Sequence, residues 1–271
     1  MTGSSESGSR PGAASRIAGP GAQAAPTLYL SVVIPAYNEE ERLRRAIPAI
    51  AAHLRSKGDC EIIVVDDGSR DGTARVTEEL ARAHPLLRLI SYRPNRGKGC
   101  AVRTGMLAAR GRYVLFTDAD QSTPIGELDK LLAKLERDGY DVAIGSRQMP
   151  GARVEQAQAW YRELAGQAFG CATKLFCLRG LHDTQCGFKA MRSEVAQQVF
   201  PRVTSDTAIF DIEMLVVATR AGYRVAELPV QWVHDPDTRI PYNLRRALRI
   251  WAELFRIRRA QRVGWPLRVR Q

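Results

Sequence analysis

The chain contains 271 residues, of which 45% are hydrophobic, and it carries a formal net charge of +11. This length and composition are enough for one full hydrophobic core, either as a large single domain or as one domain with appendages. No window reaches the roughly 18 apolar residues that a membrane-spanning helix needs, so we expect a soluble or peripheral protein.

The positive charge is concentrated at the C-terminal end. Residues 239–271 contain ten arginines and one acid, Glu253, so this segment carries +9 and the rest of the chain only +2. We therefore expect no nucleic-acid groove in the main domain. Residues 1–26 are rich in Gly, Ser, Ala and Pro and lack the apolar stretch of a signal peptide, which predicts a disordered tail. The remaining residues, 27–238, form the predicted main domain.

Apolar, β-branched runs alternate with helical patterns through the first half of the chain. Buried strands are predicted at Leu28–Pro35, Glu61–Asp66, Leu87–Ser91, Tyr113–Thr117 and Asp141–Ser146. Helices are predicted after the first four of these strands, at Glu39–Leu54, Thr73–Ala83, Lys98–Ala109 and Ile125–Arg137. This alternation predicts an α/β fold with a mainly parallel sheet.

The second half of the chain is less regular. We expect helices at Tyr161–Phe176 and Ile212–Ala221, and strands at Phe188–Arg192 and Val225–Trp232. The five cysteines are scattered, and none forms a Cys-x-x-Cys pair. A zinc site or disulfide framework is therefore not expected, and a reducing cytoplasm is favoured.

Polar side chains collect where the predicted strands end. Asp66 and Asp67 follow the second strand, and Arg147 follows the fifth. Asp118 and Asp120 follow the fourth strand, and their spacing of two points both carboxylates to one side of an extended backbone. Taken separately, such loops are often polar or simply cap a helix. Together on one sheet edge they predict a ligand site, and the two aspartates suit a divalent cation that also binds a diphosphate.

Five motifs follow one another along the chain. They are Ser31–Glu40 (SVVIPAYNEE), Val64–Thr73 (VVDDGSRDGT), Asn95–Gly99 (NRGKG), Asp118–Asp120 (DAD) and Gly145–Arg147 (GSR). In this order they resemble the family 2 glycosyltransferases of GT-A fold. Asp183–Lys189 and Phe210–Glu213 resemble the dolichyl-phosphate β-glucosyltransferase branch of that family, next to the dolichyl-phosphate mannose synthases. The resemblance covers about residues 28–260.

The resemblance implies roles for individual residues. Asp120 would be the principal ligand of Mg²⁺ or Mn²⁺, with Asp118 beside it, and the cation together with arginines would stabilise the departing nucleoside diphosphate. Lys98 would add a point charge, although a solvated lysine at a helix start explains it equally well. The residues implied in nucleotide-sugar binding are Pro35, Tyr37, Glu39, Asp66, Asp67, Lys98, Asp118, Ala119 and Arg239.

The acceptor is inferred from what the chain lacks. Relatives that transfer sugar to a hydroxyl often carry a Glu-Asp pair and a Gln-x-x-Arg-Trp motif, and neither is present here. Asp211 and Glu213 are the nearest candidates for a catalytic base, although acids at a helix start usually act as electrostatic caps. A phosphate monoester, with a second pKa of about 6, needs no base. Arg147 and Arg162 are then the candidates for binding the acceptor phosphate.

The C-terminal segment has the pattern of a basic amphipathic helix. Leu244, Leu248, Trp251 and Phe255 recur at helical spacing, with Ala247 and Leu254 alongside and arginines over much of the remainder. This pattern predicts a helix on an anionic membrane surface, with Trp265 suited to the interface. The alternative is that the apolar stripe packs on the main domain. The eukaryotic relatives carry an N-terminal membrane anchor, and we expect none in residues 1–26 of this chain.

Together these features predict a metal-dependent, inverting glycosyltransferase, peripheral on the cytoplasmic face of the membrane. The resemblance implies transfer of glucose from UDP-glucose to a polyprenyl or dolichyl phosphate. The alternatives within the class are a mannose synthase with a GDP donor and an N-acetylhexosamine transferase. A transferase acting on a soluble sugar hydroxyl is disfavoured by the missing base motif. An inactive nucleotide-sugar-binding membrane adaptor is the alternative outside the class. The sequence does not indicate the oligomeric state.

Overall fold

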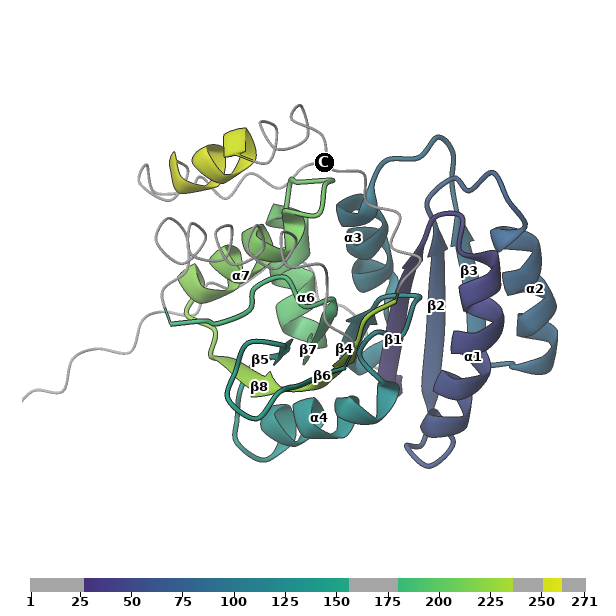
Figure 1. Cartoon of the computed structure of the whole chain (residues 1–271), viewed down its shortest axis with the longest axis horizontal. Coiled ribbons are helices and arrows are strands. Elements are labelled where there is room, and N and C mark those ends of the chain that lie inside the picture. The colour runs from purple at the N-terminus through teal and green to yellow at the C-terminus, as the bar shows by residue number, and fades with distance from the viewer. Residues whose placement is uncertain (1–26, 156–179, 236–250, 260–271) are drawn as a thin grey trace, which may run out of the picture.

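The computed structural model describes residues 27–155, 180–235 and 251–259. Its main feature is a seven-stranded sheet in the order β3-β2-β1-β4-β7-β5-β8, and a small sheet pairs β6 with β9 (Figure 1). Neighbours in the large sheet are parallel except at β7, which runs antiparallel to both β4 and β5. The strands are β1 (Leu28–Ala36), β2 (Cys60–Asp66), β3 (Leu87–Ser91), β4 (Gly111–Thr117), β5 (Val142–Ser146), β6 (Arg153–Glu155), β7 (Phe188–Arg192), β8 (Val225–Pro229) and β9 (Gln231–Val233).

Helices cover both faces of the large sheet (Figure 1). Residues 251–259 are also helical. The other helical elements are α1 (Glu40–Leu54), α2 (Thr73–Ala83), α3 (Lys98–Ala108), η1 (Ile125–Glu127), α4 (Leu128–Glu136), α6 (Ser193–Val199), η2 (Phe200–Arg202) and α7 (Phe210–Arg220).

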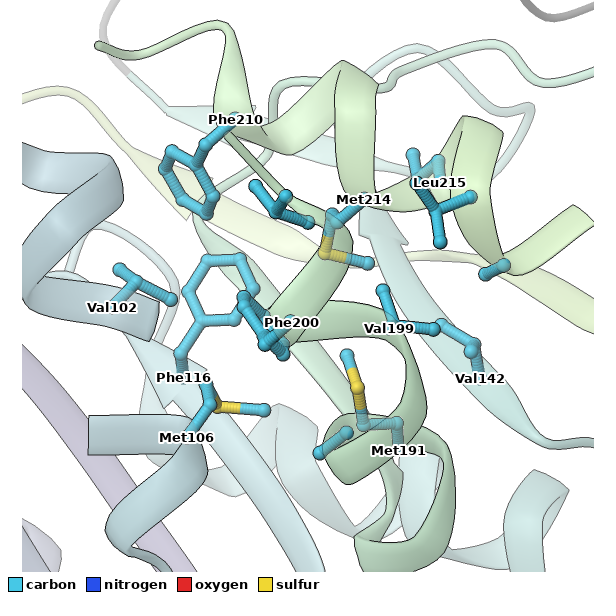
Figure 2. Close-up of a cluster of buried hydrophobic side chains, with 14 of the residues drawn as sticks. Val102, Met106, Phe116, Val142, Met191, Val199, Phe200, Phe210, Met214 and Leu215 are labelled. Atoms are coloured by element: carbon cyan, nitrogen blue, oxygen red, sulfur yellow. The ribbon is translucent and has the colours of Figure 1, made fainter. Parts of the chain in front are cut away.

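Alternation along the strands divides the core into two clusters. In β1, Val32 and Ile34 pack with α1 and α4, whereas Val33 points to the opposite face. That opposite face is covered by α3, α6, α7 and residues 251–259. Figure 2 shows this second cluster around Phe116 of β4 and Phe210 of α7, whose ring centroids lie 5.6 Å apart. The strands are thus held from both sides, which fixes the loops at their ends.

Helix α1 illustrates how the pattern produces the packing. Leu43, Ile47, Ile50 and Leu54 follow a spacing of three or four residues and are all buried. Each contributes about 1.5–3 kcal/mol of hydrophobic stabilisation relative to an exposed side chain. The exposed residues of the same helix include charged side chains, such as Arg44, which pairs with Glu40 one turn earlier.

The structure confirms the α/β class and the mainly parallel sheet. One expectation needs correction. The predicted strand Val225–Trp232 is divided into β8 and β9, because the chain leaves the large sheet near Val230 to pair with β6. Helix α6 and strand β6, by contrast, had no counterpart among the expected elements. The predicted tail 1–26 and the predicted helix Tyr161–Phe176 lie outside the described residues.

Within the described part of the chain, no helix combines the length and the apolar character needed to cross a membrane.

Candidate active site

Asp66 and Asp67, at the end of β2, form hydrogen bonds that hold the loops at the carboxyl ends of the parallel strands. The Asp66 carboxylate accepts hydrogen bonds from the Ser69 backbone amide at 2.9 Å and the Ser91 hydroxyl at 3.0 Å. The Asp67 carboxylate accepts three bonds of 2.8 Å from residues 95–97, two of them from backbone amides. Both aspartates are buried. Their carboxylates therefore fix the wall of the site, because their hydrogen-bonding capacity is largely used within the protein.

Asp118 is held between a lysine and a glycine. Lys98, the first residue of α3, places its Nζ 2.6 Å from the Asp118 Oδ1. A Cβ atom on Gly187 would lie 2.1 Å from the Asp118 Oδ2, so only glycine permits this close approach. Burial alone lowers the pKa of Lys98, but the carboxylates of Asp118 and Asp211 raise it above its ordinary value. Lys98 is therefore a fully charged partner of Asp118.

Asp120 faces a cleft of about 520 Å³. Its Oδ1 accepts a hydrogen bond of 2.9 Å from the Ser122 backbone amide. Burial, and next the negative charge of Asp118, raise the pKa of Asp120 above its ordinary value. A cation beside these two carboxylates would relieve their repulsion. The other residues that line the cleft are Arg42, Arg45, Ala46, Ala49, Ala119, Gln121, Ser122, Pro124, Ile125, Val233, His234 and Asp235.

Asp211, at the start of α7, is buried with a lysine rather than exposed to the cleft. Its carboxylate is ion-paired with Lys189 of β7, whose side chain is fully buried. The same ammonium donates a 2.6 Å hydrogen bond to the Cys186 carbonyl and lies 5.2 Å from the centroid of the Phe116 ring. Burial raises the pKa of Asp211 above its ordinary value, although Lys189 and Lys98 oppose the shift. This arrangement suits a fixed counter-charge better than a base that reaches a substrate.

Arg147, which follows β5, is already paired. Its Nε lies 2.6 Å from the Asp183 Oδ2, and its Nη2 donates to the Asp183 Oδ1 at 2.9 Å. Its guanidinium also lies over the Trp232 ring, 5.6 Å from the centroid. Burial alone raises the pKa of Asp183, yet Arg147 holds it below its ordinary value. Of the three guanidinium nitrogens, only Nη1 takes no part in this two-point pairing with Asp183.

The remaining predicted residues lie around the same edge or outside the described chain. Tyr37 is 39% exposed, as a residue that stacks on a ligand requires. Glu39 accepts from Arg42, whose Nε in turn lies 2.8 Å from Asp235. Pro35 lies within β1, and Ala119 is buried between the two aspartates. Arg162 and Arg239 fall outside the described residues.

Residues 31–200 match the family model described as Glycosyl transferase family 2. The chain belongs to this family. It is therefore a glycosyltransferase, and the carboxylates at the end of β4 lie at the sheet edge where enzymes with open α/β sheets bind their ligands.

Curated relatives of this glycosyltransferase share one description. The dolichyl-phosphate beta-glucosyltransferase of Dictyostelium discoideum is 31% identical over 89% of this chain and 77% of its own. The protein of the same description from Drosophila melanogaster is 35% identical over 82% of this chain and 72% of its own. Among solved structures, glucosyl-3-phosphoglycerate synthase from Mycobacterium tuberculosis, in complex with Mn²⁺, UDP-glucose and phosphoglyceric acid, superposes with a TM-score of 0.59. That match covers 89% of this chain and 81% of the other at 20% identity, and it shows the shared GT-A fold.

Three residues of this glycosyltransferase's site had no predicted role. Lys189 and Asp183 neutralise two predicted site residues, and Asp235 pairs with Arg42 at the cleft. Lys189 alone left a signal in the sequence, because a lysine within the apolar run Phe188–Arg192 requires a buried partner. The partners themselves are 22 to 193 positions away along the chain, so no local pattern could identify them.

Proposed function

We propose that this chain transfers glucose from UDP-glucose to a polyprenyl or dolichyl phosphate. The donor sugar and the acceptor rest on the relatives described as dolichyl-phosphate beta-glucosyltransferases, which match most of the chain. The observation that carries the chemistry is that Asp120 lines a cleft just beyond the end of β4, with the carboxylate of Asp118 close enough to raise its pKa. Two carboxylates at this position suit a nucleotide-sugar donor whose diphosphate must leave with stabilised charge.

The carboxylates of Asp118 and Asp120 fit Mg²⁺ or Mn²⁺ as ligands. The described residues contain no cluster of three or more His, Cys, Asp or Glu side chains. A hard cation that binds through one or two carboxylates and substrate phosphates needs no such cluster, so Asp118 and Asp120 suffice as its protein ligands. A cation bound there would stabilise the negative charge on the departing diphosphate. The solved structure with Mn²⁺ and UDP-glucose supports the use of such a cation.

The transfer needs no proton acceptor. An oxygen of the acceptor phosphate attacks the anomeric carbon, its bond to that carbon forms as the bond to UDP breaks, and the configuration inverts. Since the acceptor is already an anion at neutral pH, it must be oriented rather than deprotonated. The burial of Asp211 against Lys189 agrees with this scheme. We assign the acceptor phosphate to the remaining Nη1 of Arg147 and to Arg162, and the donor phosphates to Lys98 and Arg239.

The donor's nucleoside belongs at the ends of β1 and β2. The exposed ring of Tyr37 offers a stacking surface, and Glu39 lies at the start of α1 next to it. Asp66 and Asp67 shape the facing wall through their hydrogen bonds to the loops. Pro35 and Ala119 supply backbone at the contact with the nucleotide.

The C-terminal segment is proposed to bind the anionic cytoplasmic face of the membrane. In the helix of residues 251–259, Trp251 is 39% and Phe255 57% exposed. The helix packs on the domain through Leu254 and Ile257 instead, so the predicted stripe is not a single buried face. Exposed aromatics beside arginines match the chemistry of an anionic bilayer surface. The rest of the predicted stripe lies outside the described residues.

The donor and acceptor can be identified in one experiment. Purified protein is incubated with polyprenyl phosphate and a panel of radiolabelled UDP- and GDP-sugars, with Mn²⁺, with Mg²⁺ or with EDTA. The expected result is a solvent-extractable product from UDP-glucose that EDTA abolishes. A preference for GDP-mannose would favour the mannose synthase, and no extractable product from any donor would refute the acceptor assignment.

The proposed cation site at Asp118 and Asp120 is tested with Asp120→Ala. We expect a loss of turnover on the order of a hundredfold or more, with unchanged thermal unfolding. Asp138→Ala is the matched control, because Asp138 pairs only with the exposed Lys134 of α4 among the contacts described. Full activity of Asp120→Ala would exclude the proposed metal site.

A further inference from the structure

The ion pair of Lys98 and Asp118 places a cation where the proposed metal must bind. The Lys98 Nζ lies 2.6 Å from the Asp118 Oδ1, and both side chains are 36% exposed. On its other side, the carboxylate abuts the backbone at Gly187, so Asp118 cannot turn away in that direction. Any divalent cation on Asp118 would therefore approach a neighbouring ammonium of like charge.

The backbone that carries Lys98 is firmly held. The amide of the next residue, Gly99, donates a 3.0 Å hydrogen bond to the Asp206 carbonyl. One turn into α3, Arg103 donates a 2.6 Å hydrogen bond to the Asp206 carboxylate. A side chain at Gly99 would collide with Ser205 and Asp206, so this loop and α3 fit without space between them. Movement of the Lys98 charge must come from its own side chain.

Lys98 is followed by two further charged residues of alternating sign, Asp211 and Lys189. The carboxylate of Asp211 also attracts Lys98, and Asp211 is itself neutralised by the buried Lys189. Lys98 is thus attracted by three carboxylates, those of Asp118, Asp211 and Asp120, of which Asp118 is in direct contact. Because the Lys98 side chain is 36% exposed, its ammonium can exchange Asp118 for an incoming anion without leaving the neighbourhood of Asp211.

We propose that Lys98 competes with the divalent cation for Asp118, so that the cation binds tightly only together with a nucleoside diphosphate. The phosphates of the incoming nucleotide attract the Lys98 ammonium away from Asp118 and leave this carboxylate for the cation. The inference rests on the proposed function, since it concerns the same donor site. It gives Lys98 two opposing effects: it weakens binding of the cation alone and strengthens binding of the nucleotide.

The opposing effects can be measured without sugar transfer. Mn²⁺ binding is followed by the electron paramagnetic resonance signal of the free ion, first without nucleotide and then with UDP. For Lys98→Met we expect Mn²⁺ alone to bind roughly fivefold more tightly than to the wild type, the range for a partly exposed ion pair. UDP in the presence of Mn²⁺ should bind at least fivefold more weakly. Unchanged or weaker binding of Mn²⁺ alone, or unchanged UDP binding, would overturn the proposal.

Three further variants fix the interpretation. Lys98→Arg retains the competing charge and should bind Mn²⁺ alone as the wild type does. Lys134→Met removes a lysine with an equally short ion pair, 2.6 Å from Asp138, far along the chain in α4, and should change neither affinity. Lys98→Met combined with Asp118→Asn should lose the gain in Mn²⁺ affinity, and a retained gain would place the cation elsewhere and overturn the proposal. These experiments measure only the affinities for Mn²⁺ and UDP and contain no acceptor. Their results can therefore be interpreted even if the protein does not transfer glucose.

Discussion

Arg147 and Asp183 hold each other in a two-point ion pair beside the end of β5. The Nε to Oδ2 distance is 2.6 Å, the Nη2 to Oδ1 distance is 2.9 Å, and the Arg147 backbone amide also donates to the same carboxylate at 3.1 Å. The Asp183 side chain is 2% exposed, whereas that of Arg147 is 28% exposed. The guanidinium therefore presents one edge to the site in an orientation that the buried carboxylate determines.

Replacing Asp183 by Asn should lower the free energy of unfolding by about 2 kcal/mol at neutral pH. The value lies below that for a fully buried pair because Arg147 keeps partial access to water. Although burial alone raises the pKa of Asp183, Arg147 depresses it, so the pair stabilises the fold above the ordinary aspartate pKa of about 4. This contribution is lost as the pH falls through the depressed value in the folded state.

Urea unfolding of the wild type and Asp183→Asn at pH 7 and at pH 3 measures this effect. The difference between the two proteins should be largest at pH 7 and smaller at pH 3. Asp138→Asn, which removes an exposed ion-pair partner, is the control and should change stability little at either pH. An equal loss for Asp183→Asn at both pH values would contradict the proposed ion-pair contribution.

Gly187→Ala should separate activity from folding. The new Cβ would lie 2.1 Å from the Asp118 Oδ2, so the carboxylate must move away from its present position. A shift of about 1 Å at a reacting site can cost on the order of a hundredfold in rate, and we expect a loss of that size in glucosyl transfer.

Gly126→Ala is the matched control for this substitution. Nothing lies within 4 Å of the Cβ position at Gly126, in η1. Transfer activity and thermal unfolding, measured for both variants, should show full activity for Gly126→Ala and near-wild-type unfolding for both. Full activity of Gly187→Ala would mean that the position of Asp118 does not limit transfer.

The strands β1 and β2 were predictable because each is buried on both faces. Leu28–Ala36 and Cys60–Asp66 contain nearly continuous apolar or β-branched residues, a pattern that few other structures share. The place of β7 between β4 and β5 was not predictable. Its residues pair with residues 45 to 79 positions away, from Ile144 with Lys189 to Tyr113 with Arg192, and no local pattern encodes such a distant register.

The site was predictable where residue type and strand end coincide. Asp118 and Asp120 were located because two carboxylates directly follow a buried strand. The ion pairs of Asp118 with Lys98 and of Asp211 with Lys189 were not predictable, because they depend on how separate elements pack. For Asp211, the sequence predicts the position at a helix start. It does not predict that the side chain is buried, because burial depends on the packing of separate elements.

The exposed aromatics of residues 251–259 should contribute to membrane binding and not to folding. Trp251→Ala with Phe255→Ala removes two exposed rings, so thermal unfolding should stay near the wild-type value. Binding to vesicles of phosphatidylglycerol and phosphatidylcholine, measured by co-sedimentation, should weaken by roughly tenfold or more because two apolar side chains are lost.

Two contrasting variants separate the faces of this helix. Leu254→Ala removes a side chain that is 2% exposed and packs in the core, so it should lower the free energy of unfolding by about 2–5 kcal/mol. Arg259→Ala, on the exposed surface, should weaken binding to anionic vesicles only, and the effect should fade as salt screens the charge. If the Trp251 and Phe255 variant binds as the wild type does, the exposed rings do not face the bilayer.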